Sequence, residues 1–184
     1  MKNYVGFHGT SETIAEEIII NSFLIDHISD RLPCDLGKGV YIFENSEKYN
    51  CQAKEQAMKY VKKYKNGYKN PTVLKVDCHV DSDKELDMNL SANKKVFHNF
   101  MNENAGEIAE ERKALIQDGA YKRGNLDGLV IELILEHYNK VVDLVIKDTY
   151  TSFNDIPGYK VSNFDNASEI CIRNTDIIQN ICVI

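Results

Sequence analysis

The sequence predicts an α+β fold in a single domain that spans residues 1–184. The 184 residues are enough to form one hydrophobic core without disulfides or metals. Segments typical of a strand, a helix, a strand and a helix follow one another, and mostly strands come after them. Because the helices come early and the strands late, we favour α+β over a regularly alternating α/β sheet.

The first four elements are predicted from residue type and spacing. Residues 4–7 are aromatic and β-branched, as in a strand, and Ser11 is placed to cap a helix that ends near Asn21. Residues 40–43 form the next predicted strand. From 46 to 64, apolar side chains return every three or four residues, which predicts a second helix.

The later elements are predicted mainly as strands. One or two helices are expected between residues 96 and 115. Strands are predicted at residues 72–80, 129–135, 141–146, 169–173 and 181–184.

Composition and charge exclude several classes of protein. The formal net charge of −6 disfavours non-specific binding to nucleic acid, since phosphate is repelled at long range. The N-terminus lacks the apolar core of a signal peptide. The best apolar run, residues 129–135, is interrupted by Glu132 and is far shorter than the ~20 residues of a membrane span. We therefore expect a cytoplasmic protein that does not bind membranes.

The cysteines predict neither disulfides nor a metal site. They are five in number and include no Cys-x-x-Cys pair: Cys34, Cys51, Cys78, Cys171 and Cys182. In a reducing compartment they are expected to be small buried hydrophobic residues. A zinc site at Cys78 and His79 would need two further ligands at suitable spacing. No metal is expected.

The segment from Asp35 to Phe43 is the most informative motif. Gly37 and Gly39 flank one residue, so the main chain there can adopt conformations that a side chain would forbid, and another molecule can approach it closely. Tyr41, in the strand that follows, offers a flat ring for stacking. A Gly-x-Gly before a strand is most often only a turn.

Two further segments carry residues suited to binding. His8, Gly9 and Thr10 follow the first strand, where an imidazole and an open main chain lie together; the alternative is a surface turn with a solvated histidine. Glu169 opens an apolar strand after a long polar segment. A carboxylate there either faces solvent or, if it faces a cleft, accepts a hydrogen bond from a sugar hydroxyl and stabilises positive charge.

In this order, the three motifs resemble those of the ADP-ribosyltransferase superfamily, in the branch of diphtheria toxin and the poly(ADP-ribose) polymerases. That branch has a His–Tyr–Glu triad on three separate strands, which His8, Tyr41 and Glu169 match. The resemblance covers residues 4–60 and 165–175. It implies a fold with two small packed β-sheets around an NAD cleft, flanked by helices.

The resemblance also implies which residues bind NAD. The Gly9 main chain would pair with the nicotinamide carboxamide and His8 with the adenosine ribose, while Tyr41 would pack against the nicotinamide. Thr10 and Gly39 would lie beside the cofactor in the same two motifs. The family often has a second tyrosine on the helix after its second motif, and Tyr49 is the candidate here, although the interval from Tyr41 is short.

The implied activity is mono-ADP-ribosylation of a protein or a nucleic acid. The bond between nicotinamide and ribose breaks through an oxocarbenium-like transition state, and Glu169 would stabilise that state by gripping the ribose 2′-hydroxyl. Arginine-modifying relatives place Glu or Gln two residues before the catalytic Glu, where this chain has Ala167. The family context suggests a bacterial toxin or defence effector, with a neutralising antitoxin as a partner. We expect a monomer.

Other functions remain open. The chain is alternatively a non-catalytic module that binds NAD or ADP-ribose, or an enzyme like the RNA 2′-phosphotransferases, which also use NAD. Residues 54–69 contain six lysines, with Tyr60, Tyr64 and Tyr68 at intervals of four. They form either a surface for a nucleic-acid strand or an amphipathic helix whose tyrosines belong to the core and whose lysines are solvated; the sequence favours the helix.

Overall fold

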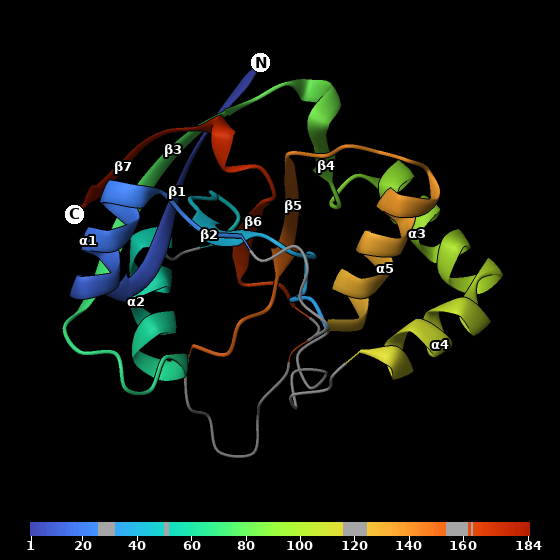
Figure 1. Cartoon of the computed structure of the whole chain (residues 1–184), viewed down its shortest axis with the longest axis horizontal. Helices are drawn as coiled ribbons and strands as arrows, with labels where there is room; N and C mark the ends of the chain where they lie inside the picture. The colour runs from blue at the N-terminus through green and yellow to red at the C-terminus, as the bar shows by residue number, and fades with distance from the viewer. Residues whose placement is uncertain (26–31, 50–51, 116–124, 154–161, 163) are drawn as a thin grey trace.

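The computed structural model describes residues 1–25, 32–49, 52–115, 125–153, 162 and 164–184. Its strands form one seven-stranded sheet in the order β4-β5-β6-β2-β1-β3-β7 (Figure 1). The strands are β1 (Lys2–Ser11), β2 (Val40–Glu44), β3 (Pro71–Val80), β4 (Glu85–Asp87), β5 (Leu144–Thr149), β6 (Ala167–Ile172) and β7 (Ile178–Val183). All neighbours are antiparallel except β4 and β5. The predicted α+β class is confirmed.

Helices cover both faces of this sheet. They are α1 (Glu12–Asn21), α2 (Ala53–Tyr64), α3 (Ser91–Glu103), α4 (Ala105–Ala114) and α5 (Asn125–His137). Figure 1 shows α1 and α2 at one end of the sheet and α3, α4 and α5 at the other. The longest of them have 13 residues, well short of the ~20 that cross a bilayer, so none of the helices described here is a candidate membrane span.

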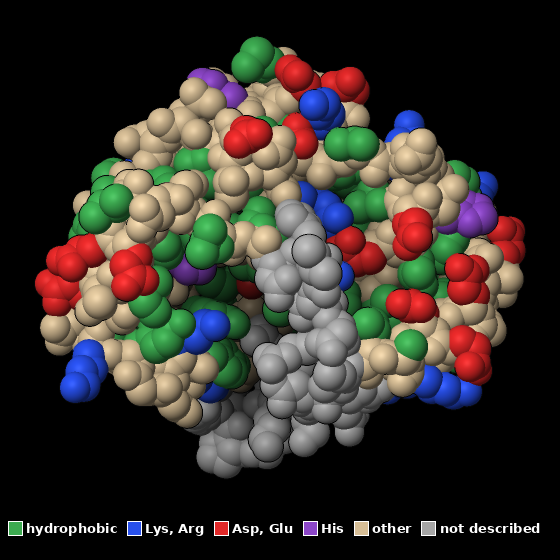
Figure 2. Space-filling model, in the orientation of Figure 1, with side chains coloured by type: hydrophobic (Ala, Val, Ile, Leu, Met, Phe, Trp, Pro, Cys, Tyr) green, Lys and Arg blue, Asp and Glu red, His purple; other side chains and the backbone are tan. Residues whose placement is uncertain are grey.

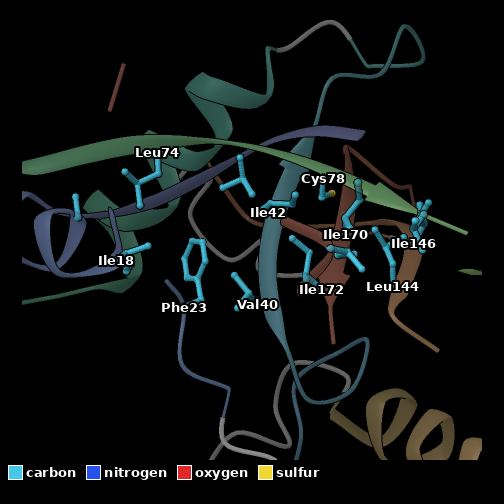
Figure 3. Close-up of a cluster of buried hydrophobic side chains, with 14 residues drawn as sticks. Ile18, Phe23, Val40, Ile42, Leu74, Cys78, Leu144, Ile146, Ile170 and Ile172 are labelled. Atoms are coloured by element: carbon cyan, nitrogen blue, oxygen red, sulfur yellow. The ribbon is translucent and has the colours of Figure 1, made fainter. Parts of the chain in front are cut away.

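The face under α1 carries a continuous aliphatic core (Figure 3). Side chains alternate between faces along a strand, so every second residue of β2, β3, β5 and β6 points into it. Ile42 of β2, for example, lies opposite Ile170 of β6, and both are almost fully buried. Phe23, which follows α1, is also part of this core.

The opposite face carries two further clusters. One packs under α2 and includes Phe43 and Ala167, and the other packs against α3, α4 and α5 and includes Cys171. Ala167, Glu169 and Cys171 share this face because they alternate along β6. Glu169 therefore lies on the strand between the two clusters.

The contact between β1 and β2 is the narrowest part of the sheet. Only Gly6–Glu44 and Phe7–Phe43 pair there, whereas β1 pairs with β3 at ten positions, from Lys2 to Ser11. The expectation of two separate sheets is wrong: one sheet has two halves joined by a short ladder. Gly6 allows the close approach at that point, because a Cβ atom there would collide with Ile42.

Most predicted elements are confirmed with shifted ends. Ser11 caps α1, its hydroxyl accepting a hydrogen bond from the Ile14 N–H at 3.4 Å, and α1 ends at Asn21 as predicted. The second helix begins at Ala53, later than the predicted start at residue 46.

The strand predicted at 129–135 is wrong, because these residues lie inside α5. They are buried on more than one side by the sheet and the neighbouring helices, so the apolar run is nearly continuous and carries no clear period. The expected order of early helices and late strands is wrong for the same reason.

The cysteines only partly follow the prediction. Cys78 and Cys171 are fully buried, as expected, and burial raises the pKa of each thiol to about 12. Cys34 is exposed and Cys182 is half-buried, which corrects the prediction for those two. No disulfide joins these four cysteines in the described part of the chain, and Cys51 lies outside it.

Candidate functional site

A cleft opens where β1 and β2 separate. It encloses about 470 Å³, within the roughly 300–1,000 Å³ of typical ligand sites. Figure 2 shows a hollow walled largely by hydrophobic side chains on this face of the molecule. Five residues predicted from the sequence line the cleft: His8, Gly9, Gly39, Tyr41 and Glu169.

Residues from both faces of the sheet line the cleft. Val40 and Phe23 belong to the core under α1, whereas Phe43 and Glu169 belong to the opposite face, and all four line the cleft. These walls meet where β1 and β2 no longer pair, beyond Phe7.

His8 spans the gap between the separated strands. Its Nδ1 lies 2.8 Å from the main-chain oxygen of Tyr41. A carbonyl oxygen can only accept, so Nδ1 carries the proton and Nε2 of the neutral ring is left as an acceptor. The ring also makes an edge contact with Phe23, with centroids 5.2 Å apart. His8 thus offers a positioned acceptor to a ligand hydroxyl.

The charge state of His8 gives a prediction about stability. Burial lowers the pKa of His8 below 6.5, and nearby Lys65 lowers it further, against the opposing effect of the Tyr41 hydrogen bond. Between the two pKa values the unfolded chain binds more protons than the folded one, so the free energy of unfolding should fall as the pH drops below about 6.5. Denaturant titrations at pH 7 and pH 5.5 should show a smaller fall in His8→Gln than in the wild type.

The control for this measurement is the same replacement at exposed His98. His98→Gln should retain the wild-type difference between the two pH values. A wild-type difference in His8→Gln would contradict the neutral state assigned to His8.

Tyr41 holds the turn that forms one wall of the cleft. Its hydroxyl accepts from the Leu36 N–H at 2.8 Å and donates to the Gly37 oxygen at 2.7 Å. Burial strongly raises the pKa of Tyr41, so the phenol stays protonated. The hydroxyl is thus committed to the turn, and the ring is the part of Tyr41 that can meet a ligand.

Glu169 reaches the cleft from the middle of β6. It is 6% exposed and lies opposite Phe43 of β2 on one side and Lys147 of β5 on the other. A buried carboxylate beside a cleft is suited to accept a hydrogen bond from a ligand hydroxyl and to stabilise a nearby positive charge.

Gly9 has a packing role that the motif did not indicate. A Cβ atom at this position would overlap the main-chain oxygen of Ala57, so the absence of a side chain lets α2 lie directly on β1. At Gly39, a Cβ atom would lie 2.5 Å from the Ile172 oxygen. Both glycines permit close backbone contacts as well as lining the cleft.

Two predicted site residues do not line the cleft. Thr10 is 2% exposed and is buried at the end of β1. Tyr49 is hydrogen-bonded to Asp148, and burial raises the pKa of its phenol to about 12. Tyr60 of α2 lines the cleft instead, with its ring 6.0 Å from that of Phe43.

The lysine-rich segment matches the amphipathic helix rather than a row of stacking rings. Tyr60 and Tyr64 are half-buried with their rings 5.1 Å apart, and the Tyr64 hydroxyl donates to the Ser152 oxygen at 2.6 Å. Lys59 and Lys62 lie exposed on the same helix. From this segment, Tyr60 and Lys65 line the cleft.

Glu132 and Arg173 are absent from the predicted set although they support the cleft. They form an ion pair that also binds the main chain of Lys38. The sequence did contain a signal for this pair: Glu132 interrupts the apolar run 129–135, and a carboxylate in such a run is rarely buried without a cation. Within the described residues, no three His, Cys, Asp or Glu side chains are grouped as they would be around a metal ion.

The comparisons with protein-family models, with curated proteins and with solved structures found no match for this chain.

Proposed function

We propose that this protein is an NAD-dependent mono-ADP-ribosyltransferase that transfers ADP-ribose to a macromolecular acceptor. The observation that carries the proposal is the meeting of His8, Tyr41 and Glu169 in one cleft. They come from three strands, and more than 120 residues separate Tyr41 from Glu169 in the sequence. Their order and residue types are those of the family triad that the sequence resembles.

The cleft has groups that suit each part of NAD. The Nε2 atom of His8 can accept from a ribose hydroxyl, and the rings of Tyr41 and Tyr60 offer apolar surfaces to nicotinamide. Alternate residues of an antiparallel strand direct both N–H and C=O to the same side. Beyond Phe7, β1 therefore offers a donor and an acceptor toward the side that β2 has left, which suits a carboxamide.

The proposed reaction is a substitution at the ribose carbon attached to nicotinamide. The bond from that carbon to the ring nitrogen breaks, and nicotinamide leaves with the electron pair. A bond then forms to an oxygen or nitrogen of the acceptor, which releases its proton. Glu169 would hold the ribose 2′-hydroxyl and stabilise the positive charge that develops on the sugar.

The test is incubation with NAD labelled in the nicotinamide ring and, separately, in the adenine. The protein should release labelled nicotinamide, and the adenine label should move to a macromolecule in a cell extract. Nuclease or protease treatment then identifies the acceptor class. If calorimetry detects no NAD binding, the proposal is wrong.

Two other outcomes favour the alternatives. NAD binding without nicotinamide release would indicate a non-catalytic module. Nicotinamide release coupled to transfer of an RNA 2′-phosphate onto ADP-ribose would indicate an enzyme like the RNA 2′-phosphotransferases.

A further inference from the structure

The turn at residues 34–39 is a wall of the cleft that side chains hold in place. Cys34, Asp35 and Gly39 line the cleft, yet the β-pairing of the turn with the described part of the chain is a single bridge between Cys34 and Gly37. Main-chain groups away from water need hydrogen-bond partners. Here buried side chains supply several of them.

Two groups of contacts meet at this turn. On one side, the Tyr41 hydroxyl binds the Leu36 N–H and the Gly37 oxygen. On the other side, the Lys38 N–H donates to Glu132 Oε1 at 2.6 Å, and Arg173 Nη1 donates to the Lys38 oxygen at 3.3 Å.

Glu132 and Arg173 also bind each other through a two-point contact. Arg173 Nη1 bonds to Oε1, and Nη2 bonds to Oε2 at 2.9 Å. Their side chains are only 21% and 13% exposed. Burial alone would raise the pKa of Glu132, but the hydrogen bonds and charge of Arg173 outweigh it and lower that pKa overall. The pair stays charged at neutral pH.

A partly buried ion pair of this kind contributes little net stability to the fold. Removing two charges from water offsets most of their attraction, and apolar side chains of similar volume often stabilise as well. What the pair does provide is geometry. The planar guanidinium and the carboxylate form hydrogen bonds in defined directions, so each bond constrains the position of its partner. The pair can therefore set the position of the Lys38 peptide groups between Gly37 and Gly39.

We propose that Glu132 and Arg173 are positioning residues that hold the 34–39 turn in its ligand-ready form. This role rests on the proposed function, because the ligand in question is NAD. A wall fixed in advance spares the ligand the entropy of ordering it, which raises affinity. The pair acts through the turn and does not line the cleft.

The test compares Glu132→Ala, Glu132→Gln and the wild type. Alanine removes the acceptor for the Lys38 N–H and leaves Arg173 without its carboxylate, whereas glutamine keeps an acceptor and loses the charge. Charged hydrogen bonds contribute enough for a loss of about tenfold in NAD affinity in Glu132→Ala, with a smaller loss in Glu132→Gln. The KM for NAD should rise while kcat changes little, because Glu169 is unaltered.

The control is Glu85→Ala at the far edge of the sheet. Glu85 is equally a buried carboxylate with two partners, Lys2 at 2.7 Å and Tyr4 at 2.8 Å, and does not line the cleft. Both alanine variants should unfold at lower temperature than the wild type, but only Glu132→Ala should lose NAD affinity. Equal affinity losses in the two variants would show that the pair contributes stability alone.

A second readout does not depend on NAD. Cys34 is exposed on the turn, and its main-chain oxygen accepts from the Gly37 N–H at 2.9 Å. Alkylation of Cys34 in ligand-free protein, located by peptide mass spectrometry, should be faster in Glu132→Ala than in the wild type and unchanged in Glu85→Ala. An unchanged rate in Glu132→Ala overturns the positioning role, whereas a faster rate in a protein that binds no NAD overturns only the proposed function.

Discussion

Replacing Glu169 with glutamine is expected to lower the rate of nicotinamide release by roughly 10²–10³, the usual cost of one well-placed electrostatic contact. Glutamine keeps the shape and a hydrogen-bond acceptor but lacks the negative charge that opposes the developing positive charge on the ribose. Because that charge exists mainly in the transition state, NAD binding should change much less than turnover. Single-turnover kinetics and calorimetry measure the two separately.

The matched control is Glu44→Gln. Glu44 is a half-buried carboxylate next to Phe43 on β2, but it points to the other face of the sheet, is hydrogen-bonded to Ser168 and does not line the cleft. Its loss should leave turnover close to the wild-type rate. If Glu169→Gln turns over as fast as Glu44→Gln, Glu169 is not the catalytic carboxylate.

Replacing Gly128 with alanine is expected to destabilise the fold by about 1–3 kcal/mol, the cost of inserting a methyl group into a filled space. Gly128 lies in α5, where a Cβ atom would overlap the main-chain oxygen of Cys34 and lie 3.0 Å from the Gly37 nitrogen. These are backbone atoms, so the turn or the helix must move. Denaturant unfolding measures the loss, and NAD affinity should fall with it because the turn lines the cleft.

Gly106 offers the same substitution without the collision. It lies in α4, and a Cβ atom there would meet nothing within 4 Å. Gly106→Ala should therefore stabilise the protein by about 0.5 kcal/mol through helix propensity. If both alanine variants shift stability in the same direction, α5 does not pack against the turn as the structure describes.

The elements that the sequence predicted well are those with a local signal. Ser11 marks the start of α1 because its hydroxyl can reach an N–H in the first turn, and residues 40–43 lie between a glycine turn and a polar stretch. Both signals depend on residues that are neighbours in the sequence. The α5 helix lacked such a signal, because its burial by distant elements removes the polar face that would reveal a helical period.

The sequence predicted those residues of the candidate site that belong to local motifs, and it missed those whose place depends on the tertiary fold. His8, Tyr41 and Glu169 are carried by short motifs, so their residue types were visible one strand at a time. The second aromatic ring depends on where the next helix begins and how it lies over the cleft: α2 begins at Ala53, after Tyr49, and Tyr60 of α2 lines the cleft. The support from Glu132 and Arg173 joins residues 41 positions apart, a contact that needs the tertiary fold.

The short ladder at Gly6–Glu44 and Phe7–Phe43 gives the sheet a narrow waist between its two halves. Beyond that waist, His8 reaches across from one end and Tyr41 from the other. A molecule bound to both would act as a brace, adding a further link between halves that are already joined by the two residue pairs, by the His8–Tyr41 hydrogen bond and by the contacts of Lys2 and Tyr4 with Glu85. Amide hydrogens of β1 and β2 near the waist should then exchange with solvent more slowly in the occupied protein, even where they do not touch the bound molecule.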